Sequence, residues 1–141
     1  MVIMGIDPGI KNTGIAVLNT DEKGMDCGTL KPQDLGDLHK QIIGILIKVK
    51  PHLVAIEGAI LGFSKSPSSH LEAFGVIVAV LQTLKIPYQE LTPPEWKKIL
   101  FGKGIISKTE IHKMMREKVK GIKEHEMDAI CLIFAYMKKN L

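Results

Sequence analysis

Three acidic residues stand where sequence rules place the end of a strand or the start of a helix. Asp7 and Glu57 each end a run of apolar, strand-favouring residues, and Asp128 lies near the start of a helical pattern. Carboxylates at strand ends point out of the sheet edge beside one another, and gathered like charges repel unless a cation balances them. Oxygen ligands of this kind suit Mg²⁺ or Mn²⁺. The pattern therefore predicts a metal-dependent enzyme that acts on phosphodiester bonds.

Each acid also has a simpler structural explanation. Asp7 precedes Pro8-Gly9 and could be only a turn residue. Glu57 could be a strand-end acid that is solvated or paired, and Asp128 could favour the dipole of its helix. These explanations stay open for each residue taken alone.

The composition is typical of a globular protein with one core, since 45% of the 141 residues are hydrophobic and 24% are charged. We expect a single domain over residues 1–141. Cys27 and Cys131 match neither a disulfide framework nor a zinc spacing, which favours a reducing cytoplasm. No secretion signal is expected, and the apolar stretch around residues 73–81 is too short to cross a bilayer.

The net charge of +4 is unevenly distributed. Residues 1–85 carry eight Lys and eight acidic residues, whereas residues 86–141 carry eleven Lys or Arg and seven acidic residues. The excess therefore lies in the C-terminal part, which is typical of a surface that faces phosphates. Solubility is the alternative explanation.

Apolar periodicity and turn residues predict five strands, at about 2–7, 14–18, 25–30, 53–57 and 87–91. One helix is predicted between Asp34, which can cap it, and Pro51, which ends it. Other helices are predicted at about 69–84 and 123–138, with further starts at 92–95 and 107–110 and a loop at 58–68. Three strands followed by alternating elements indicate an α/β layered sheet with an antiparallel portion.

The predicted helix at 69–84 opens with a capping box at Ser69 and Glu72 and is apolar nearly all round. It therefore needs a second partner, either another copy of the chain or a covering layer within the monomer. The lone tryptophan, Trp96, is predicted to anchor a short helix in the core rather than to stack on bases.

The ordered motifs resemble those of the RuvC Holliday-junction resolvases. The resemblance covers nearly the whole chain and includes a similar stretch at residues 94–114. The motifs that carry it are Gly5-Ile6-Asp7-Pro8-Gly9 with Thr13-Gly14, then Ala55-Ile56-Glu57, and then His125-Glu126-Met127-Asp128-Ala129.

This resemblance implies the ribonuclease H-like fold, with a five-stranded mixed sheet flanked by helices. It also implies a crossover junction endodeoxyribonuclease that nicks four-way DNA junctions symmetrically during recombination and repair. A junction offers two equivalent scissile phosphates, so a homodimer with two equivalent sites is expected. A motor that drives branch migration is a further partner that the sequence leaves open.

Carried over by position, the family's metal-binding residues match Asp7, Glu57, His125 and Asp128. His125 and Asp128 are three residues apart and share a helix face, although His125 could also be only a polar residue near a helix start. Two Mg²⁺ or Mn²⁺ ions about 4 Å apart suit phosphodiester hydrolysis. We expect Asp7 to bridge them, Glu57 to complete one site, and Asp128 with His125 to complete the other.

The DNA-contacting lysines of the family match Lys97 and Lys108, and Lys98 and Lys103 lie in the same stretch. These cations would hold the DNA backbone and offset charge in the transition state. A solvated charged face is the alternative explanation.

One departure from the family concerns the aromatic residue that follows the second acid by three positions and opens the junction. Ile60 stands there, and the nearest aromatic residue is Phe63. This favours, as an alternative, a relaxed endonuclease for forks, flaps and other branched DNA. A non-catalytic DNA-binding protein is a second alternative, although unneutralised acids would repel DNA. An ATPase of the sugar-kinase type would need a duplicated domain and a second glycine-rich loop, which this chain lacks.

Overall fold

The fold is seen in a computed structural model of the whole chain, which describes residues 1–60, 68–116, 119 and 121–141. Within these residues a single sheet has the strand order β3-β2-β1-β4-β5. The strands are β1 (Val2–Asp7), β2 (Thr13–Asn19), β3 (Gly24–Leu30), β4 (Leu53–Glu57) and β5 (Tyr88–Leu91). The prediction of five strands is therefore confirmed.

The central strand β1 is antiparallel to β2 and parallel to β4, so the sheet is mixed, as predicted. Ile6 pairs with Ile56 across β1 and β4. Asp7 and Glu57 each follow one of these paired residues, which places both carboxylates at the same edge of the sheet.

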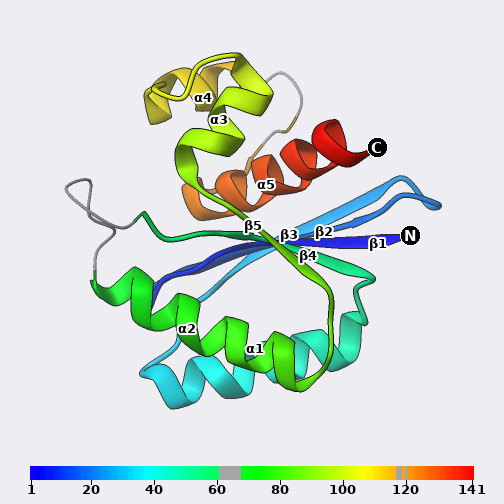
Figure 1. Cartoon of the computed structure of the whole chain (residues 1–141), viewed down its shortest axis with the longest axis vertical. Coiled ribbons are helices and arrows are strands. Elements are labelled where there is room, and N and C mark those ends of the chain that lie inside the picture. Colours follow the sequence, from blue (N-terminus) through cyan, green and yellow to red (C-terminus); the bar gives the residue numbers. More distant parts are fainter. Residues whose placement is uncertain (61–67, 117–118, 120) are drawn as a thin grey trace.

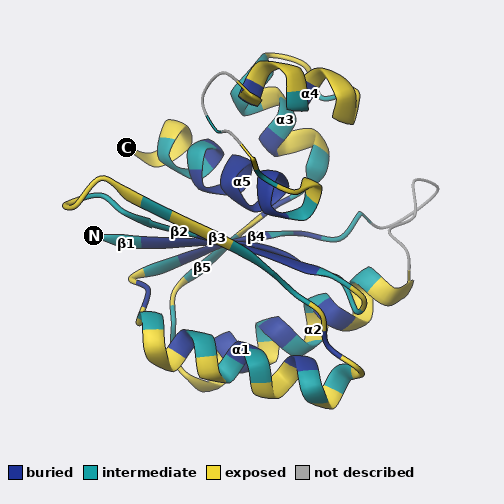
Figure 2. Ribbon diagram, turned by 180° about the vertical axis from the view of Figure 1, so that it is seen from behind, coloured by how far each residue is buried: buried dark blue, intermediate teal, exposed yellow. Residues whose placement is uncertain are grey.

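Helices cover both faces of the sheet (Figure 1). One face carries α1 (Leu35–Val49) and α2 (Ser68–Thr83). The other face carries α3 (Pro93–Phe101), α4 (Lys108–Arg116) and α5 (Glu124–Asn140). Figure 2 shows that α5 presents its buried residues to the sheet, whereas α4 is largely exposed. No helix among the described residues is both long and apolar enough to span a membrane.

The apolar character of β1 follows from this layering. Ile3 belongs to the core beneath α5, whereas Met4 and Ile6 belong to the core beneath α1 and α2. All three side chains are fully buried. A strand covered on both faces needs an unbroken apolar run rather than alternation, which is why β1 could be predicted as a central strand.

Most predicted helix starts are confirmed. Asp34 caps α1 by accepting a hydrogen bond from the backbone N–H of Asp37 at 2.7 Å. The side chain of Glu95 accepts from the backbone N–H of Thr92 at 2.8 Å, and the backbone N–H of Glu110 donates to Ser107 Oγ at 3.1 Å.

The predicted capping box at Ser69 is wrong in position. α2 already includes Ser68, so Ser69 lies inside the helix and its backbone cannot be the extended cap that such a box requires. Of the predicted loop at 58–68, residues 61–67, with Phe63, lie outside the described residues.

α2 is covered on one face only. Ala73, Ile77 and Leu81 are buried against α1 and the sheet, whereas Leu71, Gly75 and Ala79 are exposed. The alternative of a helix sandwiched within the monomer is therefore wrong. A spacing of four residues places Leu71, Gly75 and Ala79 in one stripe on the outer face.

α5 packs unusually close to the sheet because two glycines let it approach. A methyl group on Gly5 would overlap the carbonyl oxygen of Ala129, and one on Gly14 would overlap that of His125. Both clashes would be with helix backbone, which cannot rotate away as a side chain can. The absence of side chains at Gly5 and Gly14 therefore lets α5 lie close to the strand that ends in Asp7.

We expect Gly14→Ala to displace the first turn of α5 and to lower the free energy of unfolding by about 1–3 kcal/mol or more, as overpacking does. Gly44→Ala is the matched control, because a methyl group at this exposed helical position meets nothing within 4 Å. The control should stabilise the protein by about 0.5–1 kcal/mol. Urea unfolding of both variants measures the difference, and equal stability would contradict the close packing of α5.

Candidate active site

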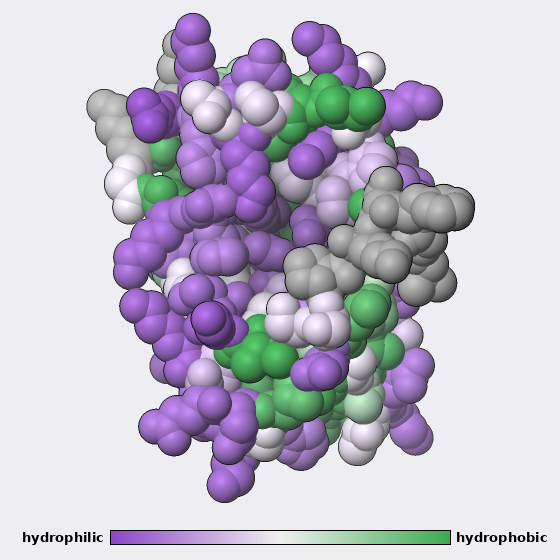
Figure 3. Space-filling model, turned by 90° about the vertical axis from the view of Figure 1, so that its left-hand side faces the viewer, coloured by the Kyte–Doolittle hydropathy of each residue, from purple (hydrophilic) through white to green (hydrophobic). Residues whose placement is uncertain are grey.

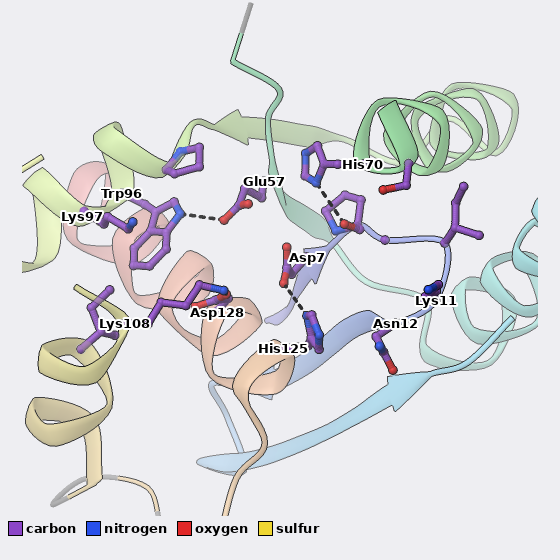
Figure 4. Close-up of a pocket in the computed structure, with 16 residues that line it drawn as sticks. Asp7, Lys11, Asn12, Glu57, His70, Trp96, Lys97, Lys108, His125 and Asp128 are labelled. Atoms are coloured by element: carbon purple, nitrogen blue, oxygen red, sulfur yellow. Dashed lines mark hydrogen bonds and ion pairs between the residues drawn. The ribbon is translucent and has the colours of Figure 1, made fainter. Parts of the chain in front are cut away.

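Asp7, Glu57 and Asp128 meet in one pocket of about 620 Å³. Asp7 and Glu57 come from the adjacent ends of β1 and β4, and Asp128 comes from the second turn of α5 (Figure 4). Asp7 and Asp128 are each only 7% exposed. The predicted convergence of three acids that lie far apart in the sequence is thus observed.

Four further segments line the pocket: the turn after β1, the start of α2, α3 and the start of α4. The pocket opens on the side of the molecule seen in Figure 3, where hydrophilic side chains gather around the middle of the surface. The α3 and α4 walls belong to the part of the chain that carries the excess positive charge.

The pocket places the three acids under strong mutual repulsion. Burial, then Asp7 and Asp128, raise the pKa of Glu57 to about 8. Burial, then Asp7, raise the pKa of Asp128 to about 7. Desolvation and like charge both disfavour the ionised forms, and a divalent cation would relieve both. The donor set therefore fits a metal such as Mg²⁺ or Mn²⁺.

Trp96 fixes the orientation of Glu57. Its indole Nε1 donates a hydrogen bond to Glu57 Oε2 at 3.0 Å, and the ring is 1% exposed. The prediction of Trp96 as a core anchor is confirmed, but its hydrogen bond to the site was missed. A buried indole N–H generally needs an acceptor, although the sequence does not tell which one.

His125, from α5, contacts Asp7. Its Nδ1 lies 3.3 Å from Asp7 Oδ2. The hydrogen bond with Asp7 raises the pKa of His125 despite partial burial. His125 and Asp128 both line the pocket from α5, as their spacing predicted.

His70 was not predicted as a site residue, and it enters the site from the first turn of α2. A ring nitrogen of His70 and one carboxylate oxygen each of Asp7 and Glu57 lie within 4.8 Å of one another. Asp128 and His125 are outside this group. Glu57 and His70 therefore approach Asp7 as one set of possible ligands, and His125 and Asp128, both from α5, form another. No local pattern marked His70, because packing of α2 against the sheet brings it to the turn after β1.

The four predicted DNA-binding lysines have different positions. Lys97 and Lys108 line the pocket, whereas Lys98 and Lys103 are exposed and do not. Lys108 Nζ lies 2.6 Å from Glu124 Oε1 and 3.9 Å from Asp128 Oδ2. Burial lowers the pKa of Lys108, but the Glu124 hydrogen bond and Asp128 outweigh it and raise the pKa overall.

Lys97 Nζ lies 5.5 Å from the centre of the Trp96 ring, a cation–π distance. Lys11 and Asn12, in the turn after β1, also line the pocket and were not predicted. The turn itself is held by Thr13, whose hydroxyl donates to the carbonyl of Gly9 at 2.6 Å.

The first turn of α5 is anchored by Glu126, a buried acid between His125 and Asp128 on the chain. Its carboxylate accepts from Thr29 Oγ1 of β3 at 3.2 Å and from the backbone N–H of Lys123 at 3.2 Å. These bonds tie the start of the helix to the edge strand of the sheet. They hold in place the helical turns that carry both site residues.

The raised pKa values predict a pH-dependent stability for the metal-free protein. Glu57 goes from 4.5 to about 8 and Asp128 from 3.8 to about 7, so the folded protein binds more protons than the unfolded chain between these values. The free energy of unfolding is therefore highest at the acidic end of this range, falls progressively as the pH rises, and stops falling once the pH has passed about 7 for Asp128 and about 8 for Glu57.

We therefore expect the Tm measured with a chelator present to fall between about pH 5 and pH 8. Glu57→Gln should flatten this dependence and raise the Tm at the alkaline end. Glu72→Gln, an exposed acid of α2, should leave the slope unchanged. A Tm that rises across this range would contradict the raised pKa values of Glu57 and Asp128.

Comparison with known proteins identifies the family. The family model described as "Crossover junction endodeoxyribonuclease RuvC" matches residues 3–136. A protein of that name from Brachyspira hyodysenteriae is 30% identical and aligns with 99% of this chain and 96% of its own length. Another, from Prochlorococcus marinus (strain MIT 9313), is 33% identical over 83% of each chain.

Solved structures agree on the fold. Thermus thermophilus RuvC in complex with Holliday junction substrate gives a TM-score of 0.79 at 24% identity, covering 99% of this chain and 94% of that one. The Holliday junction resolvase of fowlpox virus gives a TM-score of 0.62 at 15% identity and covers 100% of both chains. The ribonuclease H-like fold is therefore confirmed. The match over residues 3–136 and the relatives at 30% identity or above show that this chain belongs to the RuvC family of crossover junction endodeoxyribonucleases.

Proposed function

We propose that this protein is a divalent-metal endonuclease that resolves four-way DNA junctions by nicking two symmetric strands. The observation that carries the proposal is the convergence of Asp7, Glu57 and Asp128 in one pocket of a RuvC-family fold. The Thermus thermophilus relative has been solved with a Holliday junction substrate, which supports branched DNA as the partner.

We assign the metal ligands around Asp7, because its carboxylate contacts His125 and also lies close to that of Glu57. Asp7 would be shared by two ions, with Glu57 on one side and Asp128 with His125 on the other. Bound ions would lower the pKa of the attacking water and neutralise the leaving 3′ oxygen. Trp96 supports this arrangement because its N–H holds one oxygen of Glu57 and leaves the other for a ligand role.

Lys97 and Lys108 are proposed to contact the phosphate at the reaction centre, since both line the pocket. Lys108 is already held near Asp128, so its charge is directed towards the site. Lys98 and Lys103 would instead contact the DNA backbone outside the pocket, because both are exposed in and just after α3. Such contacts contribute affinity through release of counterions.

A homodimer is proposed because a junction presents two equivalent scissile phosphates. The exposed stripe of Leu71, Gly75 and Ala79 on α2 is the proposed interface, since small and apolar side chains allow close helix packing. A cytoplasmic location and cooperation with a branch-migration motor stay predictions.

We expect the protein to sediment as a dimer at micromolar concentration. Ala79→Glu should shift it towards the monomer, because each interface would then bury two like charges. Lys48→Glu, on the exposed surface of α1, is the control and should remain dimeric. A wild-type monomer would contradict both the interface and paired nicking.

A relaxed branched-DNA endonuclease is the second candidate. Ile60 occupies the position where the family resemblance places a junction-opening aromatic residue. Phe63, the nearest aromatic residue, lies outside the described residues. Similar cleavage rates on three-way and four-way junctions would favour this candidate over a strict resolvase.

Asp7→Asn should reduce cleavage of an end-labelled four-way junction by roughly 10²–10³-fold or more, because the carboxylate assigned to hold the cations, and with it their stabilisation of transition-state charge, is lost. Junction binding, measured by gel shift, should remain largely intact. Asp26→Asn, an exposed acid on β3, should cleave like the wild type. Appreciable cleavage by Asp7→Asn would contradict the metal assignment.

A further inference from the structure

His70 has two contacts that define the chemistry of its ring. Its Nδ1 lies 3.0 Å from the backbone carbonyl oxygen of Pro8, which can only accept a hydrogen bond. Nδ1 must therefore carry the proton, and in the neutral ring Nε2 has the lone pair. Nε2 is buried and has no hydrogen-bond partner among the described residues. The imidazole thus has an unused lone pair in a pocket that contains three carboxylates.

The position of His70 suits a shared cation. One of its ring nitrogens and one carboxylate oxygen each of Asp7 and Glu57 lie within 4.8 Å of one another. Nε2 is the nitrogen that the Pro8 contact leaves free to bind a cation. Ligands of one octahedral ion lie roughly 3 Å apart when adjacent and about 4.2 Å apart when opposite, given metal–ligand bonds near 2.1 Å. In Figure 4 His70 lies beside Asp7 on the side remote from His125. Asp7 is therefore flanked by two imidazoles from different helices.

The Pro8 contact resembles the usual support of a metal-bound histidine. Such histidines generally give their other ring N–H to a carbonyl or carboxylate, which fixes the tautomer and the orientation of the ring. Pro8 directly follows Asp7, so the same turn holds one ligand and supports a second. The His70 ring also stacks on Phe74, with ring centroids 6.5 Å apart and an angle of 15° between the planes.

We propose that His70 is a ligand of the cation held by Asp7 and Glu57, which makes this position a mixed imidazole and carboxylate site. Imidazole nitrogen binds Mn²⁺ more readily than Mg²⁺, whose preference is for oxygen ligands. The protein should therefore bind Mn²⁺ more tightly relative to Mg²⁺ than an all-carboxylate site would. This inference rests on the proposed function in requiring a cation at Asp7 and Glu57.

The first test is calorimetric binding of Mn²⁺ and of Mg²⁺ to the DNA-free protein. His70→Ala should weaken Mn²⁺ binding by about tenfold or more and Mg²⁺ binding less, so the ratio of the two affinities falls. His70→Phe keeps a ring against Phe74 without any nitrogen and should behave in the same way. His39→Ala, an exposed histidine of α1, is the matched control. An unchanged affinity ratio in both His70 variants overturns the inference.

The second test uses pulsed EPR of the Mn²⁺-loaded protein, which detects the nitrogen of a coordinated imidazole. The signal should persist in His125→Ala, because His70 still coordinates, and should disappear in the double variant with His70→Ala. A signal already absent in His125→Ala overturns the inference. If wild-type protein cleaves junctions and binds Mn²⁺ but the His70 variants match it, only this inference fails. If wild-type protein binds neither ion, the metal-dependent function fails with it.

Discussion

The structure depends on holding three carboxylates together in a partly desolvated pocket. The ends of β1 and β4 fix Asp7 and Glu57 at one edge of the sheet, and α5 adds Asp128. Burial, together with repulsion from the neighbouring acids, raises the pKa values of Glu57 and Asp128 far above those of free carboxyls. Without a cation this arrangement opposes folding, so the rest of the molecule must keep the acids in position.

The contacts that hold the three acids in position come mainly from the layer of helices that contains α3 and α5. Gly5 and Gly14 allow the backbone of α5 to contact β1 and β2, and Glu126 ties its first turn to β3. Trp96, from α3, is buried beneath the site and restrains Glu57. A rigid frame of this kind lets ligands stay close to a productive geometry before any ion binds.

Asp7 is the central residue of the site in both charge and geometry. His125 contacts it from α5, and His70 approaches from α2 on the opposite layer of the fold. The two faces of the sheet therefore meet at this carboxylate. Because α2 also carries the exposed stripe proposed as a dimer interface, the same helix would connect subunit pairing with the site.

The strands and most helix ends were predictable because they depend on local rules. The unbroken apolar run of β1 and the caps at Asp34, Thr92 and Ser107 follow from neighbouring residues alone. Strand ends likewise placed Asp7 and Glu57 at the sheet edge, although the roles of the site residues remain predictions. The start of α2 was misplaced because the local capping signal at Ser69 lies one residue inside the helix, which already includes Ser68.

Contacts between distant segments were decided only by tertiary structure. His70 and the hydrogen bond from Trp96 to Glu57 depend on how α2 and α3 pack, which no short-range periodicity records. The separation of Lys97 and Lys108 from Lys98 and Lys103 also depends on which side of a helix faces the pocket. Local backbone preferences determined the elements and their acidic ends, and burial of apolar faces in two layers determined which side chains meet there.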